Sequence, residues 1–183
     1  MFWPFNHFKK PREPLRGTIE VIYGMIVAQA REPLFYRDLG VPDTVNGRFD
    51  LLLLHLWMLL RRLQSTPDGI GLRQGLFDYF CNDMDANLRE LGVGDLTVPK
   101  RMQAFGEAFY GRSAAYDLAL TEGVEPLAQA LCKNILNGRE IEKARGLAEY
   151  VGQSIRMLDG LDEAALRAGS WHFPTPARIA EPV

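Results

Sequence analysis

The sequence predicts an all-α protein, a single-domain bundle of about six to eight helices. Apolar residues recur every three or four positions through most of the chain, and no segment shows the two-residue alternation of a strand. Glycine and proline residues separate these periodic segments. The 183 residues are 47% hydrophobic and 24% charged, the balance of an ordinary globular protein. A chain of this length is expected to bury one core without disulfides or metals.

Residues 1–14 and 169–183 are expected to be tails, with a helical domain over residues 15–168 between them. Three prolines argue against a regular element in the first tail, and the second is proline-rich and expected to be extended. Aromatic and basic side chains of the first tail suit a membrane interface. These membrane-contact candidates are Phe2, Trp3, Phe5, Phe8, Lys9 and Lys10. The alternative is a tail folded onto the body.

The first expected helix covers residues 18–31, with Thr18 as its N-cap and Pro33 just beyond its end. After a loop, Asn46 is expected to cap a second helix that ends near Leu63. Apolar residues extend well round this second helix, which favours burial at the centre of the bundle. The competing interpretation is that part of it lines a groove for an apolar partner.

A third helix is expected over residues 72–91, with Gly92 as its left-handed C-cap. Pro99 suits the first turn of a fourth helix, in which Gly111 is a candidate interruption. Three further segments complete the expected bundle: residues 125–136, residues 141–158 and a last turn or two over residues 161–168.

The composition excludes several functional classes. The 21 Lys and Arg residues are balanced by 23 Asp and Glu residues, so nucleic-acid binding is not expected. His7, His55 and His172 are too scattered for a His-based metal site, and His55 is expected to be a core or rim residue. Cys81 and Cys132 are expected to be reduced, buried thiols.

The chain is expected to have no transmembrane segment and to be cytoplasmic. Its longest uncharged apolar run, residues 51–60, is about half the length that a bilayer span requires. The first residues lack the apolar stretch of a secretory signal.

The Asp-x-Asp pair at Asp83 and Asp85 raises the question of a divalent metal site. On a helix these positions are separated by about 200°, so the two carboxylates cannot grip one ion. Asp78 is roughly 10 Å from Asp85 along the helix. Arg89, four residues after Asp85, is the expected ion-pair partner. A metal-dependent enzyme that uses Asp78, Asp83 or Asp85 on an isoprenoid or quinone precursor remains an alternative.

Three segments carry a family resemblance: FDLLLLHLWMLLRRL at 49–63, LFDYFCNDMDANLRELGVGDLTVPKRM at 76–102 and FGEAFYGR at 105–112. Together they resemble the ubiquinol-cytochrome c chaperone family, over about residues 15–160. The resemblance implies a non-enzymatic, all-helical assembly factor of the cytochrome bc1 complex, without a cofactor, in its bacterial form. It implies binding of newly made cytochrome b at the ribosome or at the cytoplasmic face of the inner membrane.

Residues of these segments, together with nearby methionine and aromatic side chains, are the candidates for binding this client, because such side chains repack readily. The candidates are Phe49, Asp50, His55, Trp57, Met58, Asp83, Met84, Asp85, Leu88, Arg89, Gly92, Gly94, Asp95, Lys100, Arg101, Phe109, Tyr110 and Arg112. For the apolar candidates, packing in the core is the competing interpretation. For the charged candidates, the competing interpretation is that they form ion pairs, which hold the corner between the third and fourth expected helices rigid. No catalytic residue is assigned, and a scaffold for another soluble protein is a third hypothesis.

Overall fold

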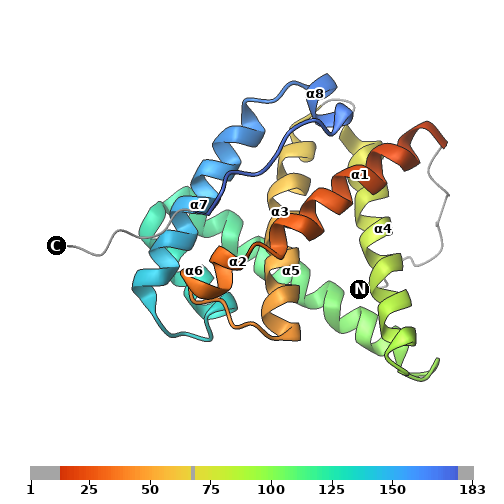
Figure 1. The fold of residues 1–183 in the computed structure, drawn as a ribbon, viewed down its shortest axis with the longest axis horizontal. Helices are drawn as coiled ribbons and strands as arrows, with labels where there is room; N and C mark the ends of the chain where they lie inside the picture. Colours follow the sequence, from red (N-terminus) through yellow and green to blue (C-terminus); the bar gives the residue numbers. More distant parts are fainter. Residues whose placement is uncertain (1–12, 67–68, 177–183) are drawn as a thin grey trace.

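The structure, a computed structural model, describes residues 13–66 and 69–176, and these residues form helices without any strand. The predicted all-α fold is therefore confirmed (Figure 1). The helices are α1 (Glu13–Ala30), α2 (Pro33–Arg37), α3 (Val45–Gln64), α4 (Gly69–Glu90), α5 (Val98–Glu122), α6 (Val124–Ile135), α7 (Ile141–Asp159) and α8 (Glu163–Ala168). The membrane-contact candidates Phe2, Trp3, Phe5, Phe8, Lys9 and Lys10 lie outside the described residues.

Some helix ends differ from the prediction. Helix α1 begins at Glu13, inside the segment expected to be a tail, because a proline such as Pro14 is tolerated in the first turn of a helix. The short helix α2 was not predicted, and its first residue is likewise a proline. Thr44, not Asn46, caps α3, since its hydroxyl accepts a hydrogen bond from the Gly47 backbone N–H at 3.1 Å. Gly111 does not interrupt α5.

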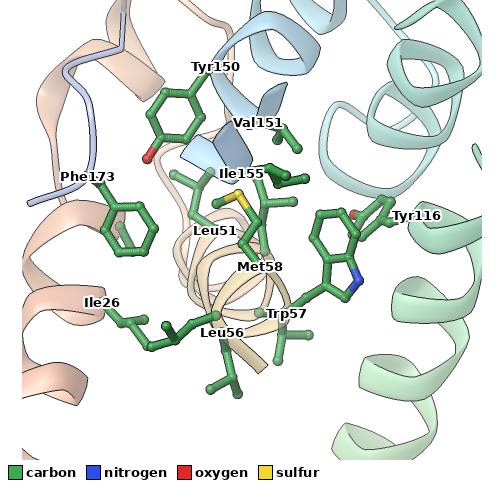
Figure 2. Packing of buried hydrophobic residues seen from close by; sticks show 14 of the residues in the cluster. Ile26, Leu51, Leu56, Trp57, Met58, Tyr116, Tyr150, Val151, Ile155 and Phe173 are labelled. Atoms are coloured by element: carbon green, nitrogen blue, oxygen red, sulfur yellow. The ribbon is translucent and has the colours of Figure 1, made fainter. Parts of the chain in front are cut away.

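Helix α3 is the central element, as the sequence predicted. Helices α1, α4, α5, α6 and α7 all contact it, and its residues 51, 53–60 and 63 are buried. Figure 2 shows side chains leaving α3 on several sides, with Ile26 of α1 on one side, Trp57 and Tyr116 on another, and Val151 and Ile155 of α7 on a third. A helix enclosed in this way needs apolar residues round most of its circumference.

Residues 170–176, the described part of the segment after α8, pack against the helices. Residues 170–176 are not helical, as expected, but Trp171 and Phe173 are buried. The Gln29 side chain of α1 donates a hydrogen bond to the Pro174 carbonyl at 3.1 Å. Burial of the two aromatic rings removes a large apolar area from water, which fixes this segment against the bundle.

The two cysteines form no disulfide: Cys132 is buried and Cys81 is half-buried. In the described part of the chain, no helix is long and apolar enough to cross a bilayer.

Gly47 at the start of α3 is expected to tolerate no side chain. A Cβ atom there would lie 2.0 Å from the backbone oxygen of Pro42. We expect Gly47→Ala to lower the free energy of unfolding by about 1–3 kcal/mol, because the loop before α3 must move. Gly106→Ala in α5 is the control, since nothing lies within 4 Å of its added Cβ and alanine favours a helix interior by up to about 1 kcal/mol. Urea denaturation of both variants checks this, and equal destabilisation would contradict it.

A candidate binding groove between three helices

An open cavity of about 370 Å³ lies between α3, α4 and α5. Its inner surface is apolar, with Trp57 and Leu60 from α3 and Phe109 from α5 nearly buried. Ile70 and Tyr110 lie at its rim, where they are 76% and 48% exposed. The remaining lining residues are Arg61, Gln64, Arg73, Gln74, Phe77, Ser113, Ala114 and Asp117. We refer to this cavity as the α3–α5 groove.

Aromatic rings form one wall of the groove and continue behind it. Phe77 of α4 lies with its ring centroid 5.3 Å from that of Phe109 and 5.9 Å from that of Tyr110. Behind them, Phe49 of α3 packs on Phe105 at a centroid distance of 4.7 Å. Aromatic pairs at these separations stabilise each other beyond their buried area. The wall of the groove is therefore preformed by contacts among three helices.

The groove combines this apolar surface with a few charges. The Trp57 indole N–H donates a hydrogen bond to the Asp117 carboxylate at 3.0 Å, which fixes the orientation of the ring. Arg61 lies 3.9 Å from Asp159. Arg73 is exposed and, within the part of the chain that the structure describes, makes no ion pair. Among the residues that the structure describes, the Arg73 guanidinium at the edge of the groove therefore has no ion-pair partner.

The predicted client candidates fall into four places. Three of them, Trp57, Phe109 and Tyr110, line the α3–α5 groove. Ile70, Arg73 and Ala114 line it as well, but the sequence did not single them out. An apolar residue beside a turn, such as Ile70, carries no signal in the sequence that separates an exposed position from a buried one.

The second place is the core, which contains His55 and Met58. Both side chains have 0% exposure, so neither is available for contact with a client in this structure. His55 Nδ1 lies 2.7 Å from the Leu51 carbonyl and its Nε2 lies 2.6 Å from the Tyr150 hydroxyl. Because a carbonyl can only accept, Nδ1 donates and Nε2 accepts from the tyrosine. Burial lowers the pKa of His55 to about 4.

The third place is the contact between the start of α3 and α5, where Asp50 and Arg112 form an ion pair at 2.7 Å. Their side chains are only 13% and 23% exposed, and Phe49 beside them is half-buried. Burial raises the pKa of Asp50 to about 6, although the Arg112 guanidinium acts in the opposite direction. This pair holds two helices together behind the aromatic wall.

The remaining candidates lie on the second half of α4 and at the corner between α4 and α5. Arg89 pairs with Asp85 at 2.6 Å, as predicted, and also contacts Asp95 across the corner. Met84 and Leu88 are half-buried on α4. Gly92 has a positive φ of 79° at the helix end. The exposed corner residues are Gly92, Gly94, Asp95, Lys100 and Arg101.

This corner and the groove are separate surfaces. Leu91 follows Phe77 by fourteen residues in the sequence, which corresponds to about 20 Å along a helix. The Phe77 ring lies in the groove wall, whereas Leu91 stands at the far end of α4. One small client segment therefore cannot cover both sets of candidates.

The carboxylates of α4 do not converge. The Asp83 carboxylate accepts a hydrogen bond from the Tyr23 hydroxyl at 2.7 Å, and Asp78 accepts one from Gln74 at 2.8 Å. Asp85 pairs instead with Arg89. Across residues 13–66 and 69–176, no group of three or more His, Cys, Asp or Glu side chains could hold a metal ion. No observation favours the alternative of a metal-dependent enzyme.

His55 and Asp50 are expected to change the stability in opposite directions as the pH falls. Between about pH 6.5, the ordinary value for histidine, and about pH 4, the unfolded chain protonates His55 while the folded chain does not. This lowers stability as the pH falls. Between about pH 4 and about pH 6 the folded chain keeps the Asp50 proton that the unfolded chain releases, which raises stability as the pH falls.

We therefore expect the free energy of unfolding of His55→Gln to rise relative to that of the wild type as the pH falls from 6 to 4. Over the same pH range, the free energy of unfolding of Asp50→Asn should fall relative to that of the wild type. Denaturant unfolding at several pH values measures both differences, in which the contributions of all other groups cancel. If the free energy of unfolding changed with pH in the same way for both variants and the wild type, these pKa shifts would be contradicted.

The fold and the groove define an all-α protein whose candidate site is an apolar binding surface. The sequence model described as ubiquinol-cytochrome C chaperone matches residues 37–173, and the chain belongs to this family. The resemblance predicted from its motifs is therefore confirmed. The family is one of assembly factors of ubiquinol-cytochrome c reductase.

A solved relative shares the fold as well as the sequence. The crystal structure of the Cbp3 homolog from Brucella abortus matches with a TM-score of 0.80 and 38% identity, over 89% of this chain and 92% of that one.

Curated relatives are longer. The ubiquinol-cytochrome-c reductase complex assembly factor 1 of Xenopus laevis is 30% identical over 131 residues, which are 70% of this chain and 66% of that protein. Protein CBP3, mitochondrial, of Saccharomyces cerevisiae is 26% identical over 149 residues, which are 78% of this chain and 44% of that protein. The chain thus spans between about half and two thirds of the length of these relatives.

Proposed function

We propose that this protein is an assembly factor that binds newly made cytochrome b and promotes its incorporation into the cytochrome bc1 complex. Its family and the names of its relatives support the assembly role. The observation that supports binding of an apolar client is the α3–α5 groove, with an aromatic wall and with Ile70 and Tyr110 exposed at its rim. Exposed apolar side chains that gather around a cavity are typical of a binding surface, whereas isolated ones are ordinary.

The size of the groove indicates how it would hold its client. A volume of about 370 Å³ accommodates a few side chains rather than a whole transmembrane helix. Each apolar side chain that leaves water on binding contributes about 1.5–3 kcal/mol. A short apolar segment of cytochrome b would therefore bind reversibly, which suits a factor that must later release its client. This occurs at the cytoplasmic face of the inner membrane, where such a subunit emerges from the ribosome.

Deletion of the gene tests the function. We expect the absorbance of the b-type haems and the activity of the bc1 complex to fall together, while other respiratory complexes keep their activity. Unchanged b-haem absorbance in the deletion strain would refute the proposal.

Photocrosslinking tests the surface separately. A photoreactive residue at Ile70 or Ala114, both at the groove, should give adducts with newly made cytochrome b. The same residue at Val124, which is 61% exposed on α6, is the matched control. Adducts with a soluble protein alone would favour a scaffold role instead, and equal adduct yields from all three positions would remove the groove from the proposal.

A further inference from the structure

Helix α4 places one guanidinium among the apolar side chains of the α3–α5 groove. Arg73 and Phe77 follow Ile70 by three and seven positions, so the three side chains lie on one face of this helix. All three line the groove. Burial raises the pKa of the Tyr110 hydroxyl at the rim, whereas the Arg73 guanidinium acts in the opposite direction. The guanidinium therefore lies near the aromatic rim.

The other charges of the groove interact with partners inside the protein. Among the described residues that line the groove, the charged ones are the cations Arg61 and Arg73 and the anion Asp117. The Asp117 carboxylate accepts the Trp57 indole N–H at 3.0 Å, and Arg61 lies 3.9 Å from Asp159. Arg73 has no ion-pair partner within residues 13–66 and 69–176. The groove therefore offers an external ligand one cation that no described carboxylate neutralises.

This cation has a consequence for what the groove can bind. An apolar occupant that covers the groove also removes water from the Arg73 guanidinium. A cation that loses water without gaining a partner costs free energy. A carboxylate on the occupant offsets this cost, because a guanidinium and a carboxylate form two parallel charge-assisted hydrogen bonds. A purely apolar segment should therefore bind less tightly than a similar one that carries Asp or Glu.

We propose that the α3–α5 groove binds a client segment in which an Asp or Glu side chain accompanies apolar ones, with the carboxylate on Arg73 and an apolar side chain against Phe77. This inference rests on the proposed function and adds which part of the client binds. Arg73 and Phe77 are one helical turn apart, about 5 Å, so the carboxylate and the apolar side chain must be similarly close. Such a segment is the end of a transmembrane helix rather than its middle, where charges are rare.

The same guanidinium selects against other segments. Cytoplasmic loops of membrane proteins carry an excess of Lys and Arg, and Arg73 would repel these cations. A charge that repels wrong partners contributes to specificity alongside one that attracts the right partner. The groove is therefore expected to bind few of the many apolar segments of newly made membrane proteins.

Titration calorimetry of the full chain with short synthetic peptides tests the proposal. The peptides share the same apolar residues, are capped at both ends, and differ in one residue, which is Asp, Asn or Lys. The Asp peptide should bind about three- to tenfold more tightly than the Asn peptide, and the Lys peptide should bind most weakly. Arg73→Gln should remove the preference for Asp and leave the affinity for the Asn peptide unchanged. Arg73→Lys should keep part of the preference, because the charge remains without the planar fork.

Arg156→Gln is the matched control, because it removes an exposed arginine of α7 that does not line the groove. Thermal melting should show both variants folded, since both side chains are exposed. Equal affinities of the wild type for the Asp and Asn peptides, or no binding of any peptide, would overturn this inference. The assembly role would then still be decided by the b-haem absorbance of the deletion strain. A preference that survives Arg73→Gln, or displacement of the Asp peptide by dodecanoate, would overturn the inference as well.

Discussion

Charged substitutions in the α3–α5 groove are expected to lower the amount of cytochrome b that copurifies with the protein at least tenfold. Ile70→Glu and Ala114→Arg place charges on the lining of the groove. Binding an apolar segment there would then require removing these charges from water, which is costly without a partner. The b-haem absorbance of a deletion strain that carries either variant should fall towards that of the deletion itself.

These substitutions should leave the fold intact, since Ile70 is 76% exposed and Ala114 is also exposed. Surface changes of this kind usually alter the free energy of unfolding by less than about 0.5 kcal/mol. Val124→Glu on α6 is the control, with an exposed apolar residue outside the groove. Normal copurification with both groove variants would show that the client binds elsewhere. Loss with the control as well would show that the effect is not specific to the groove.

His55→Ala is expected to lower the free energy of unfolding by about 2–5 kcal/mol. The side chain is completely buried, with the rings of Phe35 and Phe173 at centroid distances of 5.5 and 5.0 Å. Its removal leaves a cavity among these rings and deprives the Tyr150 hydroxyl of its acceptor. Loss of this hydrogen bond adds to the cost of the cavity, because a typical intramolecular hydrogen bond contributes about 0.5–1.5 kcal/mol.

Urea denaturation measures this loss, with His172→Ala as the control because His172 is exposed. Tyr150→Phe removes the hydroxyl and keeps the ring, so it separates the hydrogen bond from the packing. We expect its cost to be clearly smaller than that of His55→Ala. If His55→Ala and His172→Ala were equally stable, His55 would not be the core residue that the structure shows.

The sequence predicted most helices because their signals are local. The periodic apolar residues of α3 identified it as the central helix, and its burial confirms this. The pair between Asp85 and Arg89 followed from a spacing of four residues. The N-cap of α3 was predicted wrongly as Asn46, because the position of the cap depends on the exact point at which the chain turns, and this point is Thr44. There the backbone of Gly47 lies so close to the preceding loop that an added Cβ would lie 2.0 Å from the Pro42 backbone oxygen.

The candidate site was predicted less well, because exposure is not a local property. Met58 and Trp57 are neighbours on one apolar helix, yet Met58 is enclosed by the bundle and Trp57 faces the groove. The buried partner of His55 is Tyr150, which is 95 residues away in the sequence. The spacing of apolar residues along α3 or along α7 gives no indication that these two side chains meet.

The sequence by itself determined the helices, the central place of α3 and the family, since these depend on spacing and on motifs that can be read along the chain. Only the tertiary structure decided which apolar side chains are in the core and which line the α3–α5 groove. It also showed that the corner candidates are separate from that groove. The physical reason is that burial depends on which helices pack together, so two side chains with the same local pattern can have opposite surroundings.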